Sequence, residues 1–273
     1  MKKILRNPNI SAIHRAIEDN LYGFWKTCSR VDLKNVSYIG DEKYYKFSTE
    51  IPSFMVNGII DTKIPPEIAE KSITDIIQSF KEENLPFHWD IGPLSKPTNL
   101  KELLLQRNPT VSFSLPGLAL NLKELSTEKR KSPKITIVKV QDIETFKIWT
   151  KVMLNAFELP LDLLLDFYFE TLSLVFLSKN STTNAYLAYF NEKPVASSIG
   201  FYGSGVIGLY GIATLKEARG NRIGSAITLA PLYEAKDLGY EIGVLHSSEI
   251  GLNLYKRIGF KEYIQIERFI WNF

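Results

Sequence analysis

A short segment from Ala218 to Ala226 combines glycine, arginine and serine at the start of an expected helix. The first N–H groups of a helix lack acceptors within the helix, and the helix dipole places partial positive charge there. Such a helix start binds anions, phosphate groups above all. Glycine lets the backbone approach the anion, serine adds a hydroxyl donor and arginine adds charge. We therefore expect this turn to bind a phosphate, with solvated surface charge as the alternative for its arginines.

The sequence of the turn excludes two common phosphate motifs. No Gly-Lys-Ser/Thr follows, so it is not a Walker loop, and without G-x-G-x-x-G it is not a dinucleotide fingerprint. The elements around it are a strand over 206–214 and a helix from Ile223 with apolar residues at three-and-four spacing. Gly239 is expected to end that helix, and Pro231 is expected to bend it.

Strands and helices follow one another in a regular order from residue 135 onward. An alternating strand over 135–140 precedes a helix that begins at Asp142, a typical N-cap residue, and Pro160 opens a second helix. The remaining expected elements are strands 183–190, 194–202, 240–246 and 261–271 and helix 248–257. This order predicts an α/β (α+β) fold.

The first half follows a similar plan, and a polar segment separates it from the second. Leu125 to Lys134 ends in Ser-Pro-Lys and is interpreted as a linker, with a long surface loop as the alternative. This interpretation predicts two domains, 1–125 and 135–273. The elements expected before the linker are helices 10–27, 67–83 and 98–107 and strands 36–39, 43–50, 54–62, 86–91 and 110–121.

The two halves look like copies of one unit. The run from Gly58 to Thr62 can be set beside that from Gly211 to Thr214, and in both halves a long helix, a short strand, a short helix and a strand follow. Chance similarity between two α/β segments is the alternative. Where the second copy has its glycine-containing turn, the first has Lys63-Ile64-Pro65-Pro66, and prolines have no N–H to donate. We therefore expect only the second copy to bind phosphate.

Residues Tyr210 to Phe260 resemble the GNAT superfamily of N-acetyltransferases, which use acetyl-coenzyme A. The superfamily motif Gln/Arg-x-x-Gly-x-Gly/Ala, between a strand and a helix, reads Arg219-Gly220-Asn221-Arg222-Ile223-Gly224 here. A later signature, a tyrosine shortly before Gly-Phe, reads Tyr255-Lys256-Arg257-Ile258-Gly259-Phe260. Arg222 departs from the motif because it stands where the first glycine is usual. The first half then resembles the degenerate copy of a tandem GNAT protein.

The resemblance implies a GNAT fold, with a mixed central sheet whose strands 206–214 and 240–246 splay apart, and it implies roles for named residues. The coenzyme's pyrophosphate would lie on the turn, and its pantetheine arm would pair with the strand like an additional strand. A backbone N–H near a strand bulge would polarise the thioester carbonyl. The cofactor-binding residues implied are Ile212, Ala213, Thr214, Arg219, Gly220, Asn221, Arg222, Ile223, Gly224, Ser225 and Ser248.

Three polar residues have roles that compete with simpler explanations. Tyr255 would protonate the leaving thiolate, and its alternative is an ordinary packing residue of a helix. His246, at the end of strand 240–246, is a candidate general base or a structural histidine. Ser248 either contacts the coenzyme or only caps the helix that follows.

Composition excludes several other classes of protein. Among 273 residues, 33 basic and 30 acidic side chains give a net charge of +3, which provides no strong attraction to nucleic acid or to an anionic membrane. The single cysteine excludes an intrachain disulfide and fits a reducing compartment, and three histidines far apart do not suggest a metal site. No apolar signal segment follows the basic start, and charges interrupt the apolar run 159–177. We therefore expect a cytoplasmic protein without membrane or nucleic-acid partners, and a homodimer stays open.

The resemblance implies an acetyl-CoA-dependent N-acetyltransferase of the GNAT type. It would transfer the acetyl group by direct attack of a primary amine, on a small molecule or on a peptide or protein, with Tyr255 as general acid. The alternative is a non-catalytic acyl-CoA-binding sensor or scaffold.

Overall fold

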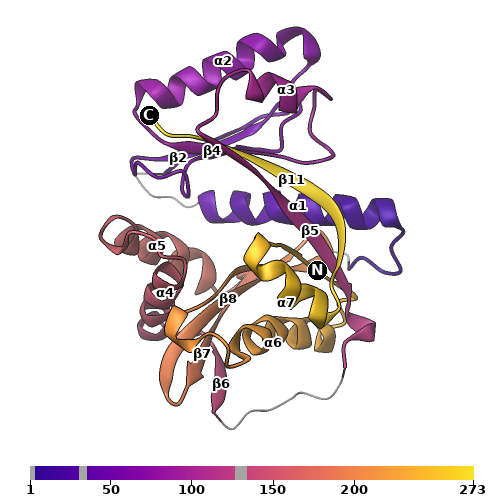
Figure 1. The fold of residues 1–273 in the computed structure, drawn as a ribbon, viewed down its shortest axis with the longest axis vertical. Helices are drawn as coiled ribbons and strands as arrows, with labels where there is room; N and C mark the ends of the chain where they lie inside the picture. The colour runs from indigo at the N-terminus through magenta and orange to yellow at the C-terminus, as the bar shows by residue number, and fades with distance from the viewer. Residues whose placement is uncertain (1–3, 31–35, 127–133) are drawn as a thin grey trace. The chain divides into compact units, whose positions relative to one another are not determined.

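The computed structural model describes residues 4–30, 36–126 and 134–273 (Figure 1). Most of the expected linker, residues 127–133, lies outside the described residues. The chain divides into two compact units. The first unit is Met1–Phe24 with Gly117–Tyr263, and the second is Trp25–Pro116 with Ile264–Phe273.

In the described residues of the first unit, the strands follow the order β5-β10-β9-β8-β7-β6. An antiparallel meander is formed by β6 (Ile135–Lys139), β7 (Thr183–Phe190), β8 (Lys193–Gly203) and β9 (Val206–Thr214) (Figure 1). Next to β9 lies β10 (Ile242–His246), which is parallel to it, and β5 (Val111–Asn121) is antiparallel to β10. The sheet is therefore mixed, as the family resemblance implies.

The helices of this unit begin close to their expected positions. α4 (Ile143–Ala156) starts after Asp142, whose carboxylate accepts a hydrogen bond from the N–H of Thr145 at 2.8 Å. The others are α5 (Leu161–Phe176), α6 (Ile223–Asp237) and α7 (Glu249–Ile258). None of the helices in the described ranges has the length and apolar character that a membrane crossing requires.

Helices cover both faces of this sheet. Ser198 of β8 faces α6, and its hydroxyl donates to the carbonyl of Ile227 at 3.0 Å. Phe201, on the opposite face of the same strand, meets the ring of Phe24 from α1 (Ile10–Ser29) edge-on, with centroids 5.8 Å apart. α6 and α1 therefore cover opposite faces of β8.

The second unit has a smaller sheet in the order β1-β2-β3-β4-β11. Its strands are β1 (Val36–Gly40), β2 (Tyr45–Thr49), β3 (Gly58–Ile60), β4 (Phe87–Ile91) and β11 (Lys261–Trp271). The two helices α2 (Pro66–Glu82) and α3 (Leu100–Leu105) pack on one face of it. Phe80, Phe87 and Trp89 are fully buried there and form the centre of the core.

The final strands of the two halves are exchanged between the units. β5 follows α3 in sequence but pairs with β10, whereas β11 follows α7 but pairs with β4. Arg268 of β11 fixes the second pairing through two hydrogen bonds of 2.7 and 2.6 Å to the buried carboxylate of Asp90. The compact units therefore do not coincide with the halves 1–125 and 135–273, whose standing as separate domains stays a prediction.

One strand is much shorter than expected. The sequence predicts a strand over 54–62, but β3 covers only Gly58–Ile60. The fully buried side chain of Asn57 explains the difference. Its Oδ1 accepts from the N–H of Thr49 at 2.7 Å, and its Nδ2 donates to the carbonyls of Ile51 and Ser53 at 2.9 and 3.1 Å. The apolar residues before Gly58 thus form a turn organised by a side chain.

Candidate active site

The C-terminal end of β9 has an open edge. β10 pairs with β9 only through Gly243–Leu245 opposite Ile207–Leu209, whereas β9 continues to Thr214. On that side no strand of the described residues pairs with Tyr210–Thr214, and these five residues are half-buried. The predicted separation of the two strands is therefore present. It leaves Ile212, Ala213 and Thr214 along an edge that another extended chain can join.

A β-bulge interrupts β9 at the start of this edge. Ile199 of β8 lies opposite Tyr210, but Ser197 lies opposite Ala213, so β9 has one residue more than β8 in this stretch. Gly211 in the bulge has a left-handed φ of +55°, and a Cβ there would lie 3.0 Å from the side chain of Ile199. The buried hydroxyl of Ser197 donates to the carbonyl of Gly211 at 2.8 Å. A side chain thus holds the bulge from the β8 side.

The turn before α6 contains two left-handed residues. Gly220 has a φ of +82° and Arg222 a φ of +62°, and the helix begins at Ile223. Successive N–H groups in such a turn form a concave surface that binds anions. The first three N–H groups of α6, those of Ile223, Gly224 and Ser225, add to it because helix geometry gives them no acceptor. The structure therefore brings the predicted phosphate-binding residues to one helix start.

Two side chains attach this turn to the end of β9. The Nε of Arg219 donates to the carbonyl of Thr214 at 3.1 Å. The Nδ2 of Asn221 donates to the carbonyls of Ala218 and Arg219 at 3.1 and 3.2 Å. Asn221 therefore shapes the turn, while the exposed side chains of Arg219 and Arg222 place positive charge beside it.

Replacing Arg222 with glycine is expected to stabilise the folded protein by about 0.5–1 kcal/mol. A left-handed backbone costs a residue with a Cβ about 1–2 kcal/mol, and the greater backbone entropy of glycine offsets about half of this gain. The free energy of unfolding, measured by urea denaturation, tests this expectation. The matched control is Arg219→Gly, because Arg219 has an ordinary φ of −62° and loses its bond to Thr214. Equal stability changes in the two variants would contradict the argument from strain.

α7 meets β9 and α6 at the same place. A Cβ added to Gly224 would lie 3.3 Å from Cδ2 of Leu254 on α7 and 3.8 Å from Oγ1 of Thr214 on β9. The residue after Leu254 is Tyr255. The two sequence motifs, far apart along the chain, therefore lie at one junction.

The ring of Tyr255 is fixed by the end of its own helix. Its carbonyl accepts from the N–H groups of Gly259 and Phe260 at 3.2 and 3.0 Å, and Gly259 has a φ of +115°. This turn brings the ring of Phe260 edge-on to that of Tyr255, with centroids 6.1 Å apart. The left-handed residue and the ring contact together explain the spacing of the tyrosine and Gly-Phe.

Burial determines the acidity of Tyr255. The side chain is only 7% exposed, and this burial raises its pKa to about 12. The phenol is therefore protonated at every pH at which the protein would work. It is a weaker acid than an exposed phenol, and it gives its proton less readily to a thiolate whose own pKa is about 8.5.

Ser248 and His246 occupy the places expected for them. Ser248 caps α7, because its hydroxyl accepts from the N–H of Gly251 at 3.3 Å. This is the helix-capping alternative, and contact with a coenzyme stays a prediction. His246 ends β10, is half-buried and lies opposite Gly117 of β5. Its role as a base also stays a prediction.

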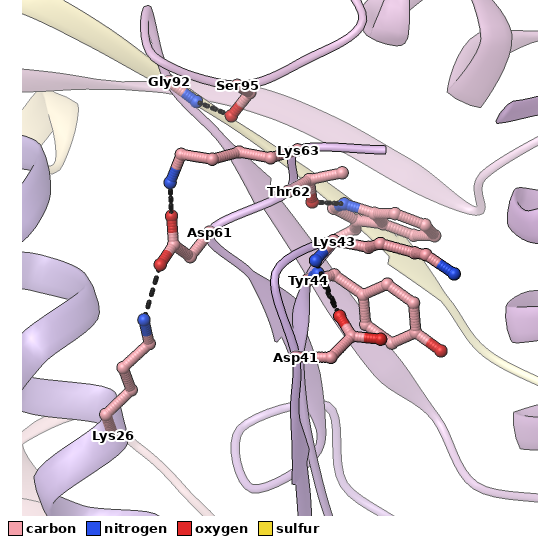
Figure 2. A network of polar contacts seen from close by, with 10 residues as sticks. Lys26, Asp41, Lys43, Tyr44, Asp61, Thr62, Lys63, Gly92 and Ser95 are labelled. Carbon is pink, nitrogen blue, oxygen red and sulfur yellow. Dashed lines mark hydrogen bonds and ion pairs between the residues drawn. The ribbon is translucent and has the colours of Figure 1, made fainter. Parts of the chain in front are cut away.

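In the second unit the corresponding edge is closed by the chain itself. The parallel pairing of β3 and β4 ends at Ile59 and Trp89. Beyond it, the N–H of Lys96 donates to the carbonyl of Thr62 at 2.8 Å, and its carbonyl accepts from the N–H of Ile64 at 3.2 Å. Figure 2 shows Thr62 and Lys63 with Gly92 and Ser95 of this closing segment, which are joined by a hydrogen bond of 3.0 Å. The backbone groups of Thr62 and Ile64 that an additional strand would need are therefore already hydrogen-bonded to Lys96.

The pairing also corrects how the halves align. Asp61, with a φ of +51°, lies two residues after the last parallel pair, as Gly211 does after Leu209. The structure thus matches Asp61 with Gly211, whereas the sequence comparison had matched Gly58, three residues earlier, with Gly211. Figure 2 shows the Asp61 carboxylate held between Lys26 and Lys63. Burial acts to raise the pKa of Asp61, but these two lysines outweigh it and lower the pKa.

We expect one molecule of coenzyme A to bind per chain. The first copy lacks the glycine-containing turn, begins α2 at Pro66 and has its edge closed by Lys96. Isothermal titration of the full chain with coenzyme A should therefore give a stoichiometry of about one. Two equivalent binding events per chain would contradict the role given to Lys96.

Sequence reasoning missed the residues that support β9 from its α1 face. The fully buried Asn20 donates through Nδ2 to the carbonyl of Gly203 at 2.8 Å, and its Oδ1 accepts from the hydroxyl of Tyr210 at 2.7 Å. A Cβ on Gly208 would lie 1.8 Å from this Oδ1. A glycine inside a strand indicates that another group approaches the backbone closely, so Gly208 could have indicated a contact at this position. Nothing in the sequence pointed to Ser197.

Several solved structures have the same fold. No protein-family model and no curated protein matches the chain. A GCN5-related N-acetyltransferase from Kribbella flavida has a TM-score of 0.69 at 15% identity, covering 94% of this chain and 95% of its own. A tandem GNAT protein from the clavulanic acid biosynthesis pathway has a TM-score of 0.60 at 9% identity, covering 96% and 94%. A GCN5-related N-acetyltransferase from Sphaerobacter thermophilus has a TM-score of 0.56 at 14% identity, covering 96% and 93%.

Proposed function

For a chain that has the GNAT fold over nearly its whole length, we propose that it transfers an acetyl group from acetyl-coenzyme A to a primary amine. The observation that carries the proposal is the open edge of β9, which leads directly into the turn and the helix start of α6. Backbone groups of Ile212–Thr214 would pair with the pantetheine amides. N–H groups from Arg219 to Ser225 would bind the pyrophosphate, with charge from the two arginines.

The chemistry would follow from the placement of these groups. With the donor along β9, the thioester carbonyl comes to the bulge, where a backbone N–H stabilises the developing negative charge on oxygen. A neutral amine held beside it attacks the carbonyl carbon, and proximity supplies much of the acceleration. As the carbon–sulfur bond breaks, Tyr255 gives its proton to the leaving thiolate. The proton lost by the amine goes to His246 or to water.

The acceptor is assigned only by class. We propose an amine of a small molecule or an amino group of a peptide or protein, and a cytoplasmic location fits the single buried cysteine. The test is to incubate the purified chain with acetyl-coenzyme A and a broad panel of amines, with release of free thiol measured by a thiol-reactive dye. Release that depends on an amine supports the proposal. Absence of coenzyme binding by calorimetry at millimolar concentration would exclude it.

One observation favours a second candidate, a non-catalytic acyl-CoA-binding sensor or scaffold. The raised pKa of Tyr255, about 12, makes it a poorer proton donor than an ordinary phenol. A protein of this kind would gain thermal stability from acetyl-coenzyme A but release no thiol with any amine. The same two measurements therefore separate the candidates.

A further inference from the structure

We propose that Ser197 is a positioning residue for acyl transfer: its hydroxyl fixes the carbonyl of Gly211 so that the N–H of Ile212 points toward the thioester oxygen of the acyl donor. The hydroxyl donates to that carbonyl at 2.8 Å. The inference rests on the proposed function and adds to it a residue that does not touch the donor.

The peptide unit between Gly211 and Ile212 determines where this N–H points. The carbonyl of Gly211 and the N–H of Ile212 belong to the same peptide bond, which is planar and trans, so the two groups point in opposite directions. Because the carbonyl is turned toward Ser197 of β8, the N–H is turned away from β8. On that side lies the edge of β9 that β10 leaves open after Leu209. The N–H is therefore aimed along the path proposed for the donor.

The bulge needs such a constraint because of its own backbone. Gly211 has a φ of +55° and, without a Cβ, crosses between backbone regions more easily than any other residue. The regular ladder with β8 is interrupted between Tyr210 and Ala213, so it does not fix this peptide. The hydroxyl of Ser197 is the contact that selects one orientation. A backbone N–H whose orientation is fixed in advance stabilises the negative charge that develops on the thioester oxygen without first having to reorient.

The neighbouring serine provides a matched control. Ser197 and Ser198 are both fully buried, and each hydroxyl donates to one backbone carbonyl, at 2.8 and 3.0 Å. Ser198 bonds the carbonyl of Ile227 inside α6, away from the bulge. Removal of either hydroxyl leaves one buried carbonyl without this partner, so the two changes have similar costs for folding. The two substitutions differ in one respect: only Ser197→Ala removes the hydrogen bond that orients the peptide between Gly211 and Ile212.

The experiment compares Ser197→Ala, Ser198→Ala and Ser197→Thr in the full chain. It measures kcat, the KM for acetyl-coenzyme A, and thermal unfolding with and without coenzyme A. A second readout does not need turnover: the infrared carbonyl frequency of bound acetyl-coenzyme A labelled with carbon-13 at the thioester carbon. A hydrogen bond to the carbonyl oxygen lowers this frequency relative to the free compound.

We expect Ser197→Ala to lower kcat about tenfold with the KM changed less than about twofold, and to move the carbonyl frequency back toward that of the free compound. Ser198→Ala should leave kcat and the carbonyl frequency at their wild-type values. Ser197→Thr should also keep both values close to wild type, because it retains the hydroxyl. Equal kcat values and equal frequencies in the two alanine variants would overturn the inference. If the wild-type chain binds the donor but shows no turnover with any amine, the proposed transferase activity fails, and the frequencies alone decide on Ser197.

Discussion

Replacing Gly224 with valine is expected to lower the affinity for coenzyme A by at least about 100-fold, or about 3 kcal/mol. Gly224 is the second residue of α6, and its missing side chain would point between Leu254 and Thr214. This is where the edge of β9 leads into the phosphate-binding turn, so the pantetheine arm and the pyrophosphate would have to pass it. An isopropyl group there occupies the space of the ligand, while the N–H groups stay in place.

Alanine at the same position provides the graded control. Its Cβ would approach Cδ2 of Leu254 to 3.3 Å, and this flexible end can move by a few tenths of an ångström. We therefore expect Gly224→Ala to weaken binding much less than Gly224→Val, as measured by calorimetry with coenzyme A. Circular dichroism and thermal unfolding show whether each variant is folded. A folded valine variant that binds with wild-type affinity would place the coenzyme elsewhere.

Replacing Tyr255 with phenylalanine is expected to lower kcat about 100-fold, while the dissociation constant for coenzyme A changes less than about twofold. General acid catalysis by a positioned side chain contributes a factor of this size. Phenylalanine keeps the ring that packs edge-on against Phe260, so the core around it is preserved. Steady-state kinetics with the best amine of the panel and calorimetry measure the two quantities. An unchanged kcat would remove Tyr255 from the mechanism.

The raised pKa of Tyr255 also predicts how the rate depends on pH. Because burial raises this pKa to about 12, the rate should increase with pH as the acceptor amine loses its proton, without a fall near pH 10 from loss of the acid.

The free energy of unfolding should depend on pH in the opposite direction and decrease at high pH. The protonated phenol contributes stability that is complete below about pH 10, the unfolded value, and that is lost as the pH rises toward about 12. A pH series of kcat and of thermal unfolding measures both.

Local signals in the sequence predicted the elements around the site well. Strand 206–214 matches β9 at both ends, because glycine and serine bound it on one side and the turn bounds it on the other. Asp142 caps α4 and Ser248 caps α7, as their residue types indicate. Each of these signals acts over a few residues, and the contacts that realise it are equally local.

The pairing of distant strands was not predictable in the same way. The paired segments of β5 and β11, Gly117–Asn121 and Glu267–Trp271, are both largely apolar, so residue type alone does not assign one to β10 and the other to β4. What distinguishes them includes the ion pair of Arg268 with Asp90, formed by residues 178 positions apart. The residue of the first half that corresponds to Gly211 was missed for a related reason. Glycine type favoured Gly58, but Asp61 is the residue that takes a left-handed φ two positions after the last parallel pair of β3 and β4.

Within the site, the family resemblance predicted which segments meet but not which contacts hold each of them in place. Arg222 stands where a glycine is usual and still takes the left-handed angle that the turn requires. Asn221 bonds backbone carbonyls, a role that its place in the motif did not suggest. Ser197 has no motif around it, since its partner is a backbone carbonyl on a neighbouring strand.

The exchange of final strands bears on how the chain is made. While it grows from its first residue, Trp25–Pro116 has β4 in place, yet the strand that covers its edge arrives only with residues 264–273. α1, up to Phe24, must likewise wait for the strands against which it packs. The second unit therefore cannot complete its sheet from the residues of the first half alone, because β4 needs Glu267–Trp271 as its neighbouring strand.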